Sequence, residues 1–588
     1  MTSENKIIAE SESKSRSSNP VPNFYRASAE DFRKIPGSPI AYSLSNNIRN
    51  IFCAKPPLGN IVPTRVGLMT SDNDKFMRFF WEVTLNSICF NALNKEEVFR
   101  SKKKWVPHNK GGQFRKWSGN QEYLLSYDKK SRDLLKRIGN HLPSEKLYFK
   151  PAVSWSEITS SSTAFRYYPN GFTFNIKGMC AFPDLKCTIE QILVLGNCKF
   201  TNHIIKIINP TISFGAGNFN SLPSAFIENS KIEENAQSLI CYAKNDWDSY
   251  ETSWDFENLP LLRAEFKCLT VEESYSRVRA HWQEMTDEMQ KLEEENNRIF
   301  IEAYGLEDEL TPDVPLSEIT LTCNPYYRYK GDKSEEELEA LLLADTMKEL
   351  ISYAVGCMFG RYSVDKPGLI LANQGEAIKD YLEKVPVPSF MPDDDNIIPV
   401  LDDEYFTDDI VTRFKEFLKV AFGPENLSQN FDFIAGGLSG KGSLNQAHGS
   451  GSGSASSESV IRNYFIKDFY RDHLKRYKKR PIYWMFSSGK SQGFNALIYM
   501  HRYDKSTLAK MRTDYLLELE SKLISERGML SDTSAGNKKR IDKINKQIAE
   551  IKEYDELLNN RALAMIEIDL DDGVAVNYAG FEGLVQKI

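Results

Sequence analysis

The residues best suited to chemistry lie between Arg100 and Trp117, where cations alternate with flat rings around two adjacent glycines. The glycines are Gly111 and Gly112, the cations are Lys102, Lys103, Lys104, Lys110, Arg115 and Lys116, and the rings are Trp105, His108, Phe114 and Trp117. Cations bind phosphate, rings stack on bases, and glycines let a backbone approach a ligand closely. This pattern indicates a nucleic-acid surface. A solvated basic loop beside two core tryptophans accounts for it equally well, so both interpretations stay open.

A second basic segment lies near the carboxyl end of the chain. It contains Lys475, Arg476, Lys478, Lys479 and Arg480 and precedes an apolar run, Pro481–Phe486, that is typical of a strand. Such a cluster can bind a phosphate backbone, although many charge runs are simply exposed to solvent. Two such segments in an acidic protein lead to the hypothesis of a charge asymmetry that serves binding.

One short motif invites comparison with amino-group methyltransferases. Asn324-Pro325-Tyr326-Tyr327 resembles the Asn-Pro-Pro-Tyr sequence in which an Asn side chain and a Pro carbonyl hold the exocyclic amine of a flipped base. Here Tyr326 replaces the second Pro, and no Phe-x-Gly-x-Gly loop for S-adenosylmethionine precedes it. A structural turn is therefore predicted, and no catalytic or cofactor-binding residue is proposed.

Composition narrows the class of protein. The chain has 588 residues, with 74 Lys plus Arg against 81 Asp plus Glu, and a formal net charge of −7. This charge argues against a protein that coats nucleic acid over its whole surface, so any contact must be local. Nine irregularly spaced cysteines, with no Cys-x-x-Cys pair, and scattered histidines predict no metal site and favour a reducing cytoplasm. The sequence also predicts neither a membrane span nor a secretory signal.

The elements that must position these residues form an α+β, multidomain chain. Residues 1–30 are expected to be a flexible leader and 31–230 a strand-rich domain, with Phe172–Ile176 and Gln191–Leu195 as examples of its strands. A mainly helical connector follows at 231–434, a Gly/Ser-rich linker at 435–459, and a carboxy-terminal domain at 460–588 that carries the second basic segment.

Helical periodicity is clearest in three places. Val271–Glu302 carries apolar residues at three- and four-residue intervals, and Ser334 followed by three glutamates marks the start of a helix that reaches Phe359. Thr507–Ile524 and Ile541–Leu558 predict an antiparallel helical hairpin, with a dimerising coiled coil as the alternative.

Several long stretches resemble the carboxy-terminal, target-recognition half of the PglX-type adenine-specific DNA methyltransferases of BREX phage-defence systems. The stretches are 32–42, 67–76, 104–123, 321–330, 341–362 and 480–504. The resemblance implies a longer protein in which a Rossmann-like methyltransferase domain, using S-adenosylmethionine, precedes the matched region. No Rossmann methyltransferase domain is recognised in this sequence, so the chain is expected to begin after that domain and to bind no cofactor itself.

The resemblance also implies a set of DNA-contacting residues and partners. Target recognition would add Arg65, Asn73, Lys75 and Asn109 to the cations of the two basic segments, because Arg and Asn side chains read guanine and adenine edges. The implied partners are double-stranded DNA and a methyltransferase chain or other BREX proteins.

The leading hypothesis is accordingly a DNA-recognition polypeptide that positions duplex DNA for N6-adenine methylation by a catalytic domain missing from this chain. A first alternative is that the chain is itself the methyltransferase, with Asn324–Tyr327 as a degenerate motif. A second alternative is a non-catalytic fragment that regulates BREX assembly through its helical hairpin.

Overall fold

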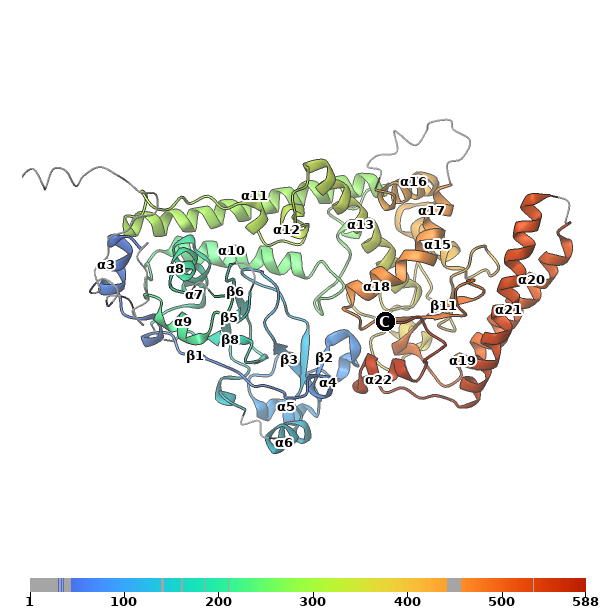
Figure 1. Ribbon diagram of the computed structural model, residues 1–588, viewed down its shortest axis with the longest axis horizontal. Helices are drawn as coiled ribbons and strands as arrows, with labels where there is room; N and C mark the ends of the chain where they lie inside the picture. The colour runs from blue at the N-terminus through green and yellow to red at the C-terminus, as the bar shows by residue number, and fades with distance from the viewer. Residues whose placement is uncertain are drawn as a thin grey trace, which may run out of the picture.

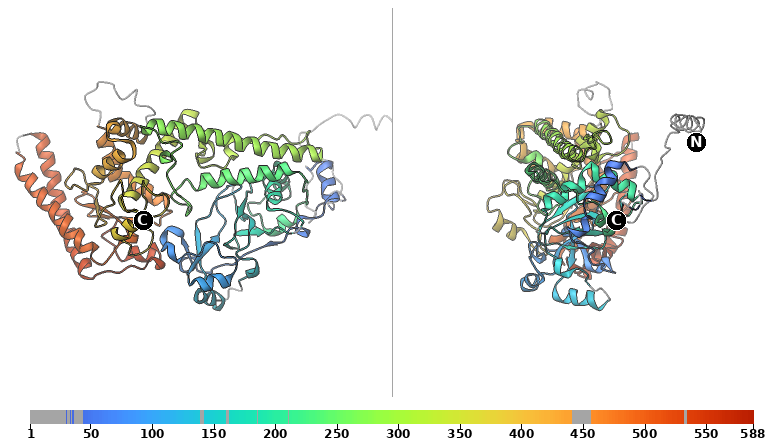
Figure 2. Two further views of the ribbon diagram at one scale, coloured as in Figure 1. Left: turned by 180° about the vertical axis from the view of Figure 1, so that it is seen from behind. Right: turned by 90° about the vertical axis from the view of Figure 1, so that its left-hand side faces the viewer.

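The computed structural model describes residues 30, 33, 35, 44–138, 142–159, 162–184, 186–209, 211–440, 456–531 and 534–588. The predicted leader, apart from residue 30, and most of the stretch 32–42 lie outside the described residues. The chain folds into an elongated molecule (Figure 1). Strands β1–β8 lie together in the amino-terminal half, and the sheet that contains β11 lies in the other half; a long helix runs along one edge, and a helical hairpin projects at the carboxy-terminal side (Figure 2).

The amino-terminal region is built on two four-stranded sheets. One has the order β1-β8-β5-β6 and is antiparallel throughout, and the other has the order β2-β4-β3-β7 with β3 and β7 parallel. Buried tryptophans such as Trp105 and Trp155 belong to the main hydrophobic core. The strands are β1 (Thr64–Arg65), β2 (Met77–Phe79), β3 (Trp105–Asn109), β4 (Tyr123–Ser126), β5 (Ala152–Ser156), β6 (Phe165–Tyr168), β7 (Thr173–Phe174) and β8 (Gly178–Ala181).

Helices surround these sheets, and one of them corrects a sequence-based expectation. Gln191–Leu195 was expected to be a strand, but it lies in helix α7 (Ile189–Asn197). Thr188 and Gln191 form a reciprocal capping box that starts the helix, and every residue from Ile192 to Asn197 is buried. A short apolar run buried on all sides has no periodicity that separates helix from strand. The neighbouring helices are α3 (Asn46–Ala54), α4 (Asn73–Phe76), α5 (Lys95–Ser101), α6 (Lys129–Arg137), α8 (Lys199–Ile208) and α9 (Ala216–Ser221).

The middle of the chain is helical, as predicted. Helix α11 (Val271–Tyr304) begins at the cap Thr270, and α13 (Glu335–Met358) begins at Ser334 with a capping box to Glu337. Both starts match the sequence signals, since an N-cap hydroxyl and first-turn acids satisfy the free backbone N–H groups. The other helices here are α10 (Ser230–Trp247), α12 (Pro325–Arg328), α14 (Ile378–Lys384), α15 (Ile410–Phe422) and α16 (Leu427–Leu438).

The ends of the predicted Gly/Ser linker are helical. Helix α16 continues to Leu438 because Ile434 and Ala435 are buried against the core, and α17 (Ser457–Tyr464) starts at the cap Ser456. Residues 441–455 lie outside the described residues.

The carboxy-terminal region contains the predicted strand and hairpin. Strands β10 (Tyr483–Ser487) and β11 (Asn495–Tyr499) pair with β9 (Ile398–Pro399) from the middle of the chain, next to α18 (Tyr470–Arg476). The hairpin consists of α19 (Thr507–Lys510), which leads into α20 (Leu517–Met529), and of the returning helix α21 (Ala535–Leu563) (Figure 2). An Arg512 Nε to Asp555 Oδ1 ion pair of 2.7 Å joins its two arms.

The last segment of the chain docks on the amino-terminal sheets. Arg78 Nη2 donates to the carbonyl oxygens of Asp571 (3.1 Å) and Asp572 (2.7 Å). The Asp571 carboxylate accepts from Trp105 Nε1 at 2.7 Å and from Lys104 Nζ at 3.0 Å. The predicted domains are thus joined by close contacts. The main hydrophobic core includes residues from Ile35 to Leu584, and a smaller one, with Val106 and Leu125, lies in the amino-terminal region. Among the residues that the structure describes, no helix is both long and apolar enough to span a membrane.

Candidate nucleic-acid interface

Three aromatic rings form a stack on the sheet that contains β2 and β4, and we call Trp81, Phe79 and Tyr123 the aromatic stack. The Phe79 and Trp81 centroids are 4.5 Å apart with ring planes 3° from parallel, and Phe79 and Tyr123 are 4.6 Å apart. Strand pairing places Phe79 directly opposite Tyr123. Trp81 is buried, whereas Phe79 and Tyr123 are half-buried. Phe79 and Tyr123 are therefore partly accessible and are packed against the buried ring of Trp81.

Cations from both predicted basic segments meet at this stack. Lys110 Nζ lies 5.0 Å from the Tyr123 centroid, and Lys478 Nζ lies 5.6 Å from that of Phe79. Burial lowers the pKa of Lys110, against the opposing influence of the nearby acids Asp74 and Glu122. The sequence predicted the two segments separately, and the fold brings them together across more than half of the chain.

Acidic groups fix the second segment in place. Lys478 forms an ion pair with Glu122. Arg480 Nε lies 3.6 Å from Glu82 Oε1, and its backbone carbonyl accepts from Trp81 Nε1 at 3.1 Å. Burial raises the pKa of Glu82, and hydrogen bonds from the backbone N–H groups of Phe79 and Val574 oppose that rise. Arg480 is therefore held against the sheet rather than directed at solvent.

The other members of the second segment differ in exposure. Lys475 and Lys479 are exposed, while Arg476 is half-buried with its Nη1 3.7 Å from Glu251 Oε2. Lys479 has a φ of 60°, as does Lys478 at 52°, so the turn is left-handed at two consecutive residues. Lys475 and Lys479 are the side chains of this segment best placed to reach a phosphate.

The predicted residues between Arg65 and Lys75 lie at the surface. Arg65 is exposed on β1 and donates to the carbonyl of Thr64 at 2.7 Å, and Asn73 and Lys75 are exposed on α4. Helix α4 adjoins the aromatic stack, because Arg480 Nη2 lies 3.9 Å from Asp74 Oδ1.

The three lysines at the start of the first segment behave differently. Lys102 is exposed, with a φ of 58° at the end of α5. Lys103 Nζ donates to the Ile88 carbonyl at 2.9 Å, and Lys104 is paired with Asp571. Of the three, Lys102 is the one directed at solvent.

Three predicted DNA contacts point into the protein instead. Asn109 is fully buried and donates to Ser154 Oγ at 2.6 Å. Arg115 Nη2 contacts Asp246 Oδ2 at 2.6 Å, with both side chains at most 4% exposed. Lys116 pairs with Glu293 of α11. Asn109 thus bonds to strand β5, and Arg115 and Lys116 join the glycine-containing loop to helices α10 and α11; all three side chains are buried.

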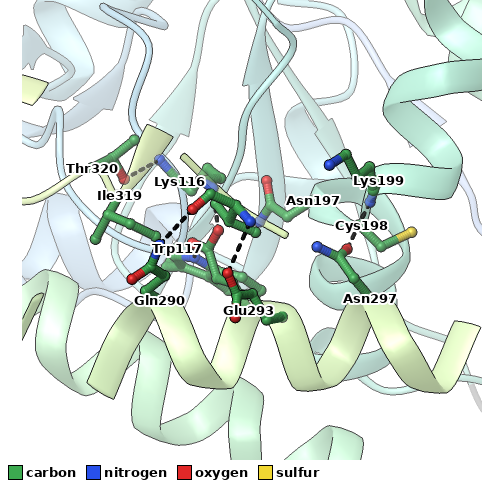
Figure 3. A network of polar contacts seen from close by, with 12 residues as sticks. Lys116, Trp117, Asn197, Cys198, Lys199, Gln290, Glu293, Asn297, Ile319 and Thr320 are labelled. Atoms are coloured by element: carbon green, nitrogen blue, oxygen red, sulfur yellow. Dashed lines mark hydrogen bonds and ion pairs between the residues drawn. The ribbon is translucent and has the colours of Figure 1, made fainter. Parts of the chain in front are cut away.

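Figure 3 shows the contacts around Lys116 and Trp117. Glu293 accepts from Trp117 Nε1 at 2.7 Å as well as from Lys116, and the Lys116 backbone N–H donates to Thr320 Oγ1 at 3.0 Å. Glu293 is one turn beyond the buried Met289 on α11. An acidic residue on the apolar face of a predicted helix is a sequence signal that could have identified Glu293 as the buried partner of a cation.

The aromatic stack was also missed from sequence. Phe79-Phe80-Trp81 is a visible cluster of rings, but alternation along a strand does not reveal which ring meets a cation from a distant segment. The pairing with Tyr123 depends on the register of β2 and β4.

The Asn324–Tyr327 motif, where a turn was predicted, forms the start of the four-residue helix α12. Asn324 caps α12, and its Nδ2 donates to the carbonyls of Leu316 and Ile319, each at 2.8 Å. Its Oδ1 accepts from the Tyr326 N–H at 3.1 Å. Both amide hydrogens and the amide oxygen are therefore used inside the protein, and the side chain is 1% exposed. Within the described ranges, no cluster of three or more His, Cys, Asp or Glu side chains could hold a metal ion.

Comparison with known proteins gives two strong similarities. The chain is 36% identical over 572 residues to the adenine-specific methyltransferase BrxX of Escherichia coli O9:H4 (strain HS). It is 37% identical over 589 residues to the adenine-specific methyltransferase PglX of Lacticaseibacillus casei (strain Zhang). Both matches include 95% of this chain but 45% and 46% of the relatives, so the chain spans about half the length of the curated relatives it matches. No family model matches. These similarities support kinship with the BrxX and PglX methyltransferases.

Proposed function

We propose that this chain is the DNA-recognition portion of a BREX-type N6-adenine-specific DNA methyltransferase. It would hold duplex DNA while a catalytic domain outside this chain transfers a methyl group from S-adenosylmethionine. The observation that carries the proposal is the convergence of distant basic segments on the aromatic stack. Lys110 and Lys478, which lie over neighbouring rings, come from opposite ends of the chain.

The surface residues divide into two groups by the contacts they make. Exposed cations bind phosphate oxygens and set the position of the duplex, whereas side chains that reach base edges carry sequence information. We assign phosphate contact to the exposed cations of the predicted set other than Lys478, which is paired with Glu122. These cations are Arg65, Lys75, Lys102, Lys475 and Lys479. Asn109, Arg115 and Lys116 position the loop that carries Lys110, because their side chains are bonded inside the protein.

The similarity to proteins named adenine-specific methyltransferases supports adenine in DNA as the target and S-adenosylmethionine as the methyl donor of the whole enzyme. The alternative that this chain carries the catalytic motif itself is not favoured. Asn324 has no free amide hydrogen with which to hold an exocyclic amine.

The test compares the variant Lys475→Ala/Lys479→Ala with the wild-type chain in binding to a short fluorescent duplex over a range of salt concentrations. Each lost phosphate contact should reduce the slope of log affinity against log salt by about 0.9. The matched control is Lys291→Ala, because Lys291 is 73% exposed on α11, along the opposite edge of the molecule from β2 and β3 (Figure 1).

A slope reduced in the double variant and unchanged in the control supports the proposal. Equal affinity of both variants and wild type at low salt refutes it. The proposal that catalysis belongs to a domain outside this chain has its own test. Methyl transfer from labelled S-adenosylmethionine to DNA by the purified chain alone would contradict it.

A further inference from the structure

A groove of about 770 Å³ lies beside the glycine-containing loop. Its walls come from the loop Gly112–Arg115, the carboxyl end of α10 at Trp247, and the segment Tyr326–Gly331. The volume falls within the ~300–1,000 Å³ of pockets that hold a ligand of a few hundred daltons. Two motifs that the sequence singled out separately, the basic loop and the Asn-Pro-Tyr-Tyr segment, therefore share one concave site.

The walls of this groove are held rigidly by one buried carboxylate. Asp246 accepts from Arg115 Nη2 at 2.6 Å, from the Thr322 N–H at 2.7 Å and from the Cys323 N–H at 2.9 Å. The Tyr327 hydroxyl also donates to the Phe114 carbonyl and so joins two of the walls. These bonds join the loop, α10 and the 320–327 segment, so the groove is formed before any ligand arrives.

The lining combines flat rings with amide groups. Phe114, Trp247, Tyr326 and Tyr327 are half-buried, and the Phe114 and Tyr327 centroids are 6.5 Å apart. Gln113 is exposed and lines the same space, as does the half-buried Asn120, whose Nδ2 donates to the Gln113 carbonyl at 3.0 Å. Rings bind the faces of nucleobases, and amides can donate to and accept from base edges.

The charges at the groove are mostly neutralised by the protein. Arg115 is paired with Asp246, and Arg328 Nη2 lies 2.8 Å from Glu349 Oε1. Lys330 is exposed at the rim. A site with paired arginines and several rings suits bases better than a phosphate backbone, which would need unpaired cations along its length.

We propose that this groove binds unpaired bases of a DNA strand. The inference rests on the proposed function for the source of the strand: Lys110, beside the aromatic stack, is followed at once by the Gly111–Phe114 loop that enters the groove. Gly111 and Gly112 have φ values of 82° and 152°, and a Cβ on Gly112 would lie 2.5 Å from the Asn120 side chain. The loop therefore needs glycine to keep this path.

The experiment measures binding of fluorescent oligodeoxythymidylate and oligodeoxyadenylate to the full chain. Phe114→Ala should weaken binding of both about tenfold, since loss of one stacked base contact has an effect of this size. Phe114 contributes its carbonyl rather than its ring to the Tyr327 bond, so that bond survives the substitution. The matched control is Phe406→Ala, another half-buried phenylalanine, which contacts Lys522 near the hairpin.

A second variant guards against a folding defect in the first. Gln113 is exposed, so Gln113→Ala leaves the packing intact and should weaken binding of the single strands roughly two- to tenfold, the effect of one hydrogen bond. Deoxyadenosine monophosphate serves as a competitor that separates a strand site from a free-nucleotide site. Competition by the mononucleotide as strong as that by the oligonucleotide would overturn the strand assignment.

The outcome is separable from that of the proposed function. Groove variants that lose single strands yet keep duplex binding support the inference. Absent single-strand binding, or equal binding by wild type, Phe114→Ala and Gln113→Ala, overturns it even where duplex binding stands. Unchanged duplex binding by Lys475→Ala/Lys479→Ala refutes the proposed function. The single-strand result then decides separately whether the groove binds unpaired bases.

Discussion

Replacing Lys116 with methionine tests whether this residue contacts DNA or forms a buried ion pair that stabilises the fold. The Lys116 and Glu293 side chains are each 5% exposed, and Glu293 also accepts from Trp117 Nε1. Removing one partner of a buried ion pair leaves an uncompensated charge and costs about 3–5 kcal/mol. We expect Lys116→Met to lower the stability of the chain by this amount at neutral to alkaline pH.

The loss should depend on pH in a defined direction. Burial raises the pKa of Glu293, and the ion pair with Lys116 and the hydrogen bonds from Lys116 and Trp117 oppose that rise. Without Lys116 the pKa of Glu293 rises further. A carboxyl whose pKa is higher in the folded state keeps a proton that the unfolded state releases. Its contribution to the free energy of unfolding is therefore present at low pH and is lost as pH rises through the folded pKa. The destabilisation is therefore larger at pH about 8 than at about 5.

The assay is thermal unfolding at these two pH values, combined with the salt dependence of duplex binding. The double variant Lys116→Met/Glu293→Gln removes both charges and keeps an acceptor for Trp117 Nε1. It should recover most of the lost stability, because neutral replacements of a buried pair are often tolerated. Its salt slope in duplex binding should equal that of wild type, since the Lys116 side chain does not reach the surface.

Two results would refute this reasoning. One is a Lys116→Met chain that melts like wild type at both pH values, which would show that the pair contributes nothing to the fold. The other is a double variant that is stable but whose salt slope falls by about 0.9, which would mean that Lys116 neutralises a phosphate.

Three further predictions concern other parts of the chain. Burial, together with the neighbouring Asp395 and Asp408, raises the pKa of Asp393 to about 8. The free energy of unfolding should therefore fall as pH rises towards 8. Urea titrations at several pH values should show a flatter pH dependence for Asp393→Asn than for wild type. Gly67→Ala should disrupt the sheet around β7, because its Cβ would lie 1.8 Å from the Phe174 carbonyl oxygen; limited proteolysis should then cut this region, and full resistance would contradict the clash. Arg78→Lys removes the fork that holds the carbonyls of Asp571 and Asp572, so hydrogen exchange should accelerate in residues 569–574, while the hairpin residues Ala535–Leu563 serve as an unaffected reference.

Local sequence signals predicted the long helices well, but they did not predict which cations are buried and which lie at the surface. Helix α11 ends at Tyr304, close to the expected Glu302. The agreement is close because capping residues and helical periodicity are properties of residues that are neighbours in the sequence. Lys110 and Arg115 are five residues apart and chemically alike, yet one lies over a ring at the half-buried edge of a sheet and the other is sealed against Asp246. The difference depends on α10, which packs behind the loop, and no local pattern encodes that packing.

The contact between Arg78 and the Asp571 carbonyl joins residues 493 positions apart in the chain. A ribosome that adds ~5–20 residues per second needs roughly 25–100 s to make the intervening chain. Throughout that interval Trp105 and the guanidinium of Arg78 lack the carboxy-terminal acceptors that satisfy them in the folded protein. During synthesis the amino-terminal sheets therefore lack these contacts until residues 571 and 572 have been made.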